Sequence, residues 1–419
     1  MTAERCRACG GELPAGNRRC GSCGTDAGGG AARHKRLGWR KRLLFSGILG
    51  CLLLGFCELG LQVVYRLSVG MWLQEWWAIP IYEPDPVRVY RVKANLDFLH
   101  KTREFTARYT TDSAGMRTEP GGSAPLVPKP ANKFRVLALG PSFAFGWGAN
   151  HEDAYVVKVA RGLRVPGKVV ELINLGTPSQ PISYQLRWLK QVGASYQPDL
   201  ILQTVYGSPE TLEPDDTLPP VGPVVKDGHL FPAEDMTASM WVRRLRRYSA
   251  LLFFGWHLKQ AATRSGAEAP ADGREFYRRT EPTGGLADLE WGEAVRRHGA
   301  YSDFVRKALP VPPAIVFLHI PFSYVVHPAD LVRVAHHGSV RDPVEIRQRT
   351  DRIVTRLNGA GFCVLDPTAE LVERDRRERM YHLYDIHFTV AGNQAVAQYS
   401  LPLIQNYLDL LARGPGTGK

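Results

Sequence analysis

Five residues of the chain have the types that acyl-transfer chemistry needs: Ser142, Gly176, Ser208, Asp385 and His387. A serine hydroxyl can attack a carbonyl carbon, a histidine can take the hydroxyl proton, and a carboxylate can orient that histidine. A glycine amide and a small polar side chain can donate hydrogen bonds to the oxyanion that forms. These residues predict nucleophilic catalysis at a carbonyl group if the fold brings them together.

The pattern of apolar runs predicts the elements that position these residues. Short runs typical of buried parallel strands lie at 134–139, 169–174, 200–205, 314–320 and 362–365. Helical stretches separate them, the clearest with Asp342 as N-cap and Asn358-Gly359 at its end. This alternation predicts an α/β fold, a doubly wound (flavodoxin-like) parallel sheet of about five strands.

The carboxyl ends of such strands form the ligand-binding edge of the sheet. Ser142, Gly176 and Ser208 each follow one of the first three predicted strands, and Asp385 and His387 precede a helix that begins near Val390. We therefore expect all five to meet at one edge. Gly140, Gly146 and Gly148 do not have the spacing of a dinucleotide-binding loop, so no nucleotide cofactor is expected there.

Composition divides the 419 residues into further parts. The predicted domains are a zinc-ribbon-like segment (1–26), a basic linker (27–42), a transmembrane helix (43–65), a neck or small β region (66–133) and an α/β domain (134–412) with an insertion at 211–310.

Four cysteines near the N-terminus have metal-ligand spacing. Cys6 and Cys9 form one Cys-x-x-Cys pair, and Cys20 and Cys23 form a second. Two such pairs supply the four thiolates of a tetrahedral, structural Zn²⁺ site. The alternative is a pair of redox dithiols. This ribbon is also a candidate binding site for a cytoplasmic protein partner.

The apolar run at 43–65 is long enough to span a bilayer, and its flanks predict its orientation. Six Lys and Arg residues lie at 33–42 and only Arg66 follows directly, which places the N-terminus in the cytoplasm. We expect a single-pass protein of the inner (cytoplasmic) membrane with an extracytoplasmic main domain. Trp72, Trp76 and Trp77 suit the far interface. The stretch 241–256 fits either an interfacial helix or, our preferred interpretation, a cap over the site.

The net charge of +12 does not indicate nucleic-acid binding, because it is concentrated at one end. Residues 1–42 carry +7, and the remaining 377 residues carry only +5. The charge of the tail is explained by membrane topology, and no nucleic-acid partner is expected.

The segments around the five residues resemble the motif blocks of the SGNH/GDSL hydrolase superfamily, especially its membrane-anchored bacterial members. Phe134–Gly148 resembles the first block, Asn174-Leu175-Gly176 the second and Asp385-Ile386-His387 the last. The third block corresponds to 198–208, and Asp112–Arg117 is similar to a segment that many of these proteins carry upstream.

The resemblance implies a role for each candidate residue and no cofactor for catalysis. Ser142 would be the nucleophile, His387 the general base and Asp385 its orienting carboxylate; Ser142, Gly176 and Ser208 would form the oxyanion hole. Three features depart from the family pattern. Pro141 replaces the acidic residue before the serine, Ser208 stands where the family has asparagine, and Asp385 precedes His387 by two residues rather than three.

The resulting expectation is a membrane-anchored serine esterase or O-acyltransferase acting on acyl esters of envelope glycans or lipids. The alternative is a catalytically impaired protein of the same fold that serves in envelope assembly or glycan binding. A further alternative places the function in the cytoplasmic ribbon.

Overall fold

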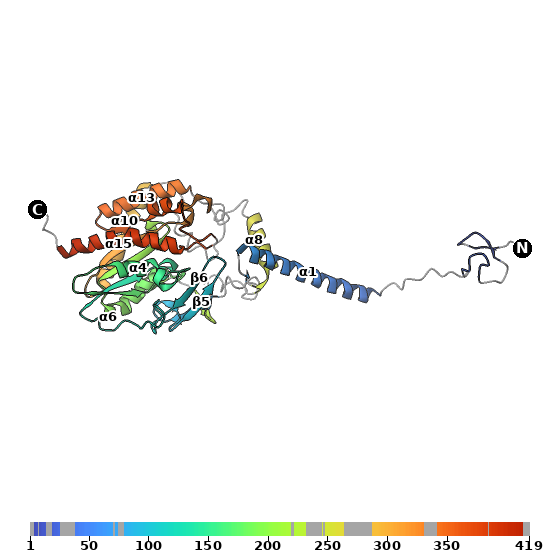
Figure 1. Ribbon diagram of the computed structural model, residues 1–419, viewed down its shortest axis with the longest axis horizontal. Helices are drawn as coiled ribbons and strands as arrows, with labels where there is room; N and C mark the ends of the chain where they lie inside the picture. Colours follow the sequence, from blue (N-terminus) through green and yellow to red (C-terminus); the bar gives the residue numbers. More distant parts are fainter. Residues whose placement is uncertain are drawn as a thin grey trace. The chain divides into compact units, whose positions relative to one another are not determined.

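A computed structural model of the chain describes residues 4–6, 8–13, 19–25, 38–69, 72–73, 79–218, 222–231, 245, 248–263, 287–330, 342–383 and 385–413. The chain forms two compact units, residues 1–59 and 60–419, and each is described by itself (Figure 1). The predicted domain boundaries stay predictions.

The first unit holds the cysteine segment. Strands β1 (Glu4–Arg5) and β2 (Glu12–Leu13) pair antiparallel. In each Cys-x-x-Cys turn a glycine with positive φ donates its amide to the carbonyl of the first cysteine, Gly10 at φ 75° and Gly24 at φ 72°. Such φ values favour glycine, and the two turns bring both cysteine pairs to the same end of the hairpin.

Helix α1 (Trp39–Val69) contains the predicted apolar span. The most apolar 18-residue window within Trp39–Leu67 has a mean hydropathy of 2.0, and none of that window is buried. The prediction of a helix long and apolar enough to cross a membrane is confirmed. Arg66 lies over the ring of Trp72 at 4.7 Å from its centroid. Trp76 and Trp77 lie outside the described residues.

The α/β domain is built on a five-stranded parallel sheet with the order β13-β12-β9-β7-β8. In chain order this is 2-1-3-4-5, the flavodoxin-like arrangement, so the predicted fold class is confirmed. The strands are β7 (Lys133–Leu139), β8 (Val169–Asn174), β9 (Leu200–Tyr206), β12 (Ala314–Ile320) and β13 (Cys363–Leu365).

Helices cover both faces of the sheet, because alternate residues of each strand point to opposite faces. Val136 and Ala138 of β7 pack in the core beneath α4 and α15, whereas Leu137 and Leu139 pack beneath α5, α10 and α13. The bounds are α4 (Tyr155–Gly162), α5 (Ile182–Trp188), α10 (Ala287–Ala308), α13 (Pro343–Gly359), α14 (Thr368–Asp375) and α15 (Val390–Arg413). Short segments are α3 (Ser142–Phe145), α6 (Ala194–Tyr196) and α11 (Ser323–Val326), with a π-helical turn at Leu189–Gly193 and 3₁₀ turns at His151–Asp153, Pro209–Thr211 and Pro328–Asp330.

Residues 211–310, predicted as an insertion, contain an integral part of the domain. Helix α10 is the crossover between β9 and β12, and its Ala294, Tyr301 and Val305 are buried against the sheet. The same stretch holds the hairpin β10 (Val224–Lys226) and β11 (His229–Phe231), and helix α8 (Ala250–Thr263).

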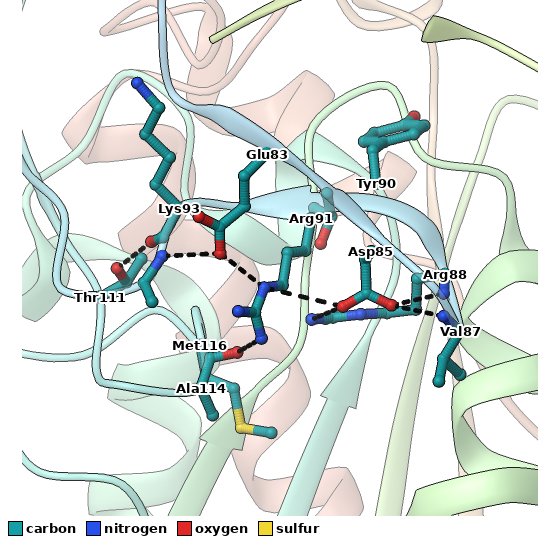
Figure 2. A network of polar contacts seen from close by, with 12 residues as sticks. Glu83, Asp85, Val87, Arg88, Tyr90, Arg91, Lys93, Thr111, Ala114 and Met116 are labelled. Carbon is teal, nitrogen blue, oxygen red and sulfur yellow. Dashed lines mark hydrogen bonds and ion pairs between the residues drawn. The ribbon is translucent and has the colours of Figure 1, made fainter. Parts of the chain in front are cut away.

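The neck consists of two antiparallel hairpins, β3 (Tyr82–Asp85) with β4 (Val89–Val92) and β5 (Asp97–Lys101) with β6 (Thr106–Thr110). Figure 2 shows a polar network that ties the first hairpin to the segment before Arg117. Arg91 Nε donates to Glu83 Oε1 at 2.7 Å, and its Nη1 donates to the carbonyl of Ala114 at 3.1 Å. The first hairpin of the neck therefore holds the segment 112–117, which reaches the candidate site.

Candidate active site

The turn that carries Ser142 can only be formed with glycine at position 140. Gly140 has φ 142°, and a Cβ there would lie 2.6 Å from the Cβ of Thr204 on the neighbouring strand β9. Pro141 follows as the N-cap of α3 with φ −76°, a value that its ring adopts without strain. Because an N-cap residue contributes no amide to the helix, proline is compatible with this turn. Ser142 is the first residue of α3 and is buried.

The structure brings Ser142, His387 and Asp385 together. The Ser142 Oγ lies 2.5 Å from His387 Nε2, and His387 Nδ1 hydrogen-bonds to Asp385 Oδ1. The same carboxylate oxygen accepts the backbone amide of His387 at 2.9 Å. The short spacing of the two residues is therefore accommodated by a turn in which Asp385 binds both the backbone and the ring of His387. In this arrangement the imidazole can take the hydroxyl proton, and the carboxylate can orient the ring and stabilise the imidazolium that forms.

The environment of Asp385 keeps it ionised. Burial alone would raise its pKa, but the charge and hydrogen bonds of His387 outweigh burial and lower the pKa of Asp385 to about 2. Trp147 Nε1 donates to the second carboxylate oxygen at 3.1 Å. Asp385 is thus a carboxylate at every pH at which the protein is expected to work.

Glu104, in the turn between β5 and β6, holds the loop of Asp385. Its Oε2 accepts the backbone amide of Asp385 at 2.9 Å, and its Oε1 accepts the amide of Leu383. This contact could not be predicted from the sequence, because Glu104 lies in a neck that shows only weak strand patterns.

The two other predicted oxyanion donors, Gly176 and Ser208, have contacts of their own at this edge. Gly176 packs against α3, where a Cβ would lie 2.4 Å from the amide nitrogen of Phe145, and its own amide donates to Asn174 Oδ1 at 2.9 Å. Ser208 is half-buried just beyond β9. The structure therefore places both at the predicted edge, and their role in an oxyanion hole stays a prediction.

Gln185 on α5 holds the turn before Ser142 through two hydrogen bonds to Gly140. Its Oε1 accepts the Gly140 amide at 2.7 Å, and its Nε2 donates to the Gly140 carbonyl at 2.7 Å. Gln185 is fully buried, so these two hydrogen bonds are shielded from water. In the sequence, the signal for this contact is a polar residue on the apolar face of a helix.

Replacing Gln185 with leucine is expected to destabilise this turn. Two buried backbone groups of Gly140 would lose their partners, at a cost of about 2–4 kcal/mol in the free energy of unfolding. Displacement of Ser142 would lower kcat for ester hydrolysis by about tenfold to a hundredfold, whereas KM would change little. The Gln185→Glu variant retains the acceptor and should be intermediate in both measurements. Wild-type kcat and stability in Gln185→Leu would contradict the clamp.

Arg117 braces the other end of α3. Its guanidinium is buried and donates to the carbonyls of Phe145 at 3.1 Å, Gly146 at 3.2 Å and Ala149 at 2.8 Å. It also lies over the rings of Tyr109 and Phe145. Burial lowers the pKa of Arg117 to about 10, so the group remains charged at neutral pH. The segment Asp112–Arg117 thus supports the helix that carries Ser142.

A second histidine–aspartate pair fixes the loop that leads to Ser208. His319 on β12 has both ring nitrogens against acceptors, Asp366 Oδ1 at 3.3 Å on one side and the Gly207 carbonyl on the other. Burial would lower the pKa of His319, but the hydrogen bond and charge of Asp366 raise it. Through these two contacts the pair joins the ends of the three strands β9, β12 and β13.

The four N-terminal cysteines are close enough to bind one metal ion. Their sulfur atoms all lie within 4.8 Å of one another, with Cys6 to Cys23 at 3.7 Å and Cys9 to Cys20 at 3.6 Å. A tetrahedral ion with metal–sulfur bonds of about 2.3 Å separates its ligands by about 3.8 Å. The donor set and spacing thus fit such an ion.

Comparison with known proteins gives structural matches only, since the sequence matches no family profile and no curated protein. A member of the lipolytic G-D-S-L family from Veillonella parvula is 9% identical, covering 64% of this chain and 97% of its own, with a TM-score of 0.33. A catalytic mutant of the acetylxylan esterase Axe2 from Geobacillus stearothermophilus is 12% identical, with coverages of 65% and 94% and a TM-score of 0.32. TesA is 10% identical, with coverages of 65% and 98% and a TM-score of 0.34. Likeness at this level leaves the chemistry to be inferred from the residues of the site.

Proposed function

We propose that the chain is a serine esterase or O-acyltransferase that forms an acyl-enzyme on Ser142. The observation that carries this proposal is the hydrogen-bonded series Ser142 Oγ, His387 Nε2 and Asp385 Oδ1 beyond the carboxyl edge of the sheet. His387 takes the proton of Ser142 while Oγ attacks the ester carbonyl. It then gives the proton to the departing alcohol, and the acyl group stays on Ser142.

The second half of the reaction decides between hydrolysis and transfer. Water or an acceptor hydroxyl attacks the acyl-Ser142 carbonyl, His387 takes its proton, and Ser142 is regenerated. We propose acyl esters of envelope glycans or lipids as substrates, because helix α1 would hold the domain at a membrane. The basic residues at 33–42, which precede the apolar run, support a cytoplasmic N-terminus and an extracytoplasmic domain.

Hydrolysis of short acyl esters by the purified full chain in detergent tests the proposal. We expect saturable release of alcohol from p-nitrophenyl acetate, and acetylated sugars added as acceptors or donors should distinguish transfer from hydrolysis. Absence of both turnover and acyl-enzyme would contradict it.

A second candidate function is binding of an acylated glycan without turnover. The engaged amide of Gly176 favours it, because an amide already bonded to Asn174 is a poorer oxyanion donor. Binding of an acetylated oligosaccharide that is undiminished in Ser142→Ala, with no product formed by the wild type, would support this candidate.

We also propose that the ion held by Cys6, Cys9, Cys20 and Cys23 is a structural Zn²⁺. Elemental analysis of the purified chain should give about one zinc per chain, and a Cys6→Ser/Cys9→Ser variant should lose it. Because the ribbon belongs to a separate unit from Ser142, ester hydrolysis should be unchanged by this loss. A full chain that retains its zinc in the double variant would contradict the assignment.

A further inference from the structure

Helix α8 packs on the C-terminal turns of α1 through aromatic contacts. The ring of Tyr65 meets Phe253 and Phe254 edge-on, with centroids 5.7 Å and 6.4 Å apart. Beside these rings, the side chains of Leu73 and Ala250 are completely buried. Figure 1 shows α8 beside the end of α1. The contacts of α8 are thus with the end of α1, and the cap interpretation of 241–256 stays a prediction.

These contacts place α8 at a defined depth relative to the apolar span. Leu61 and Tyr65, which pack against α8, both belong to the span Trp39–Leu67. If the span lies in a bilayer, a helix that touches its last turns lies at the boundary between the acyl chains and the headgroups.

The composition of α8 and the exposed residues on its outer face are typical of a helix at the boundary between acyl chains and headgroups. Residues 250–263 contain one lysine and no arginine, aspartate or glutamate, and four arginines lie at 243–247 in the sequence before them. Leu252 and Leu258 on α8 are 44% and 70% exposed. Exposed leucines on a helix preceded by arginines are the pattern of helices that bind anionic lipid surfaces.

The β5–β6 turn links the same end of α1 to Asp385. Arg103 Nη1 donates to the carbonyl of Leu67, the last residue of the span, at 3.0 Å. The next residue, Glu104, holds the amide of Asp385 at 2.9 Å. Two adjacent residues thus connect the end of the span to the loop of the catalytic carboxylate.

We propose that α8 lies in the lipid interface beside α1, and that the site of Ser142 draws its ester from the membrane surface. The substrate class is then an acyl ester carried by a lipid whose headgroup is at the interface. This substrate assignment rests on the proposed function, whereas the docking of α8 does not. The position of α8 and the substrate assignment both follow from the contacts that α8 and Arg103 make with the span.

The substrate part is tested with Leu258→Glu in full-length protein reconstituted in vesicles of phosphatidylcholine and phosphatidylglycerol. Hydrolysis of a fluorogenic ester anchored on a dialkyl lipid should fall by about tenfold, because the glutamate opposes insertion of α8. Hydrolysis of water-soluble p-nitrophenyl acetate should be unchanged. The control is Leu410→Glu, an exposed leucine near the end of α15, which should leave both rates at the wild-type level.

The docking of α8 in the lipid interface is tested by amide hydrogen exchange of residues 250–263 in the same vesicles. This measurement requires no enzymatic activity. Exchange should be at least about tenfold faster in Leu258→Glu than in wild type and in Leu410→Glu. Equal exchange in all three proteins would overturn the docking and would point to a protein partner on α8. Equal loss of both esterase activities in Leu258→Glu, or a wild type that hydrolyses p-nitrophenyl acetate but not the lipid-anchored ester, would overturn the lipid substrate. Absence of both activities in the wild type would contradict the proposed function alone.

Discussion

Replacing Ser142 with alanine is expected to lower the kcat for p-nitrophenyl acetate hydrolysis by at least about 10⁴-fold. The hydroxyl that lies 2.5 Å from His387 Nε2 is the group that would form the acyl-enzyme. His387→Ala should cause a loss of similar size, since the hydroxyl then has no base. Because the two residues act as one unit, the double variant should be no slower than either single variant.

A matched control is Ser302→Ala. Ser302 is a buried serine on α10 whose hydroxyl donates to the carbonyl of His298 at 2.8 Å. Its loss should leave kcat and KM within about twofold of the wild type and reduce stability by about 1 kcal/mol. Additive effects of Ser142→Ala and His387→Ala, or a kcat near wild type in either, would contradict the catalytic relay.

Replacing Arg117 with methionine is expected to lower the free energy of unfolding of the α/β domain by about 3–5 kcal/mol. Three carbonyls at the end of α3 would lose their donors in a dry environment, at about 1–3 kcal/mol each. Loss of the cation over Tyr109 and Phe145 adds about 0.5–2 kcal/mol. Removal of a desolvated charge offsets part of this cost, as the lowered pKa of Arg117 indicates.

Denaturant unfolding followed by tryptophan fluorescence measures this change. The control is Arg161→Met, because Arg161 is exposed and its ion pair with Glu119 spans 3.5 Å at the surface. Surface pairs contribute about 0–1 kcal/mol, so the control should unfold near the wild-type midpoint. Arg117→Lys should resemble methionine more than wild type, since an ammonium cannot reach all three carbonyls at once. Equal midpoints for Arg117→Met and Arg161→Met would contradict the bracing role.

Much of the fold follows from local patterns in the sequence. The strands of the sheet were predicted within about one residue, because buried parallel strands are short apolar runs with polar ends. Helix α13 begins where Asp342 accepts the amide of Val344, as its N-cap pattern predicted. By contrast, α10 falls in the stretch predicted as an insertion. Its sequence contains many charged residues, which obscure the apolar side that packs against the sheet.

The meeting of Ser142, Asp385 and His387 was predictable because topology brings strand ends to one edge. Two of the three departures from the family pattern have local explanations: Pro141 fits an N-cap, and Asp385 reaches His387 through a turn. The supports of the site were not predictable. Glu104 lies 281 residues from Asp385 and no period or spacing links them.

The most direct test of the central claim is intact-protein mass spectrometry after treatment with a fluorophosphonate, which reacts with activated serine nucleophiles. One adduct per wild-type chain is expected, located on Ser142 by peptide mapping and blocked by prior incubation with a short acyl ester. Ser142→Ala and His387→Ala should form no adduct, and Ser302→Ala should react like the wild type. An unlabelled wild-type chain, or labelling that persists in Ser142→Ala, would contradict the assignment of Ser142 as the nucleophile.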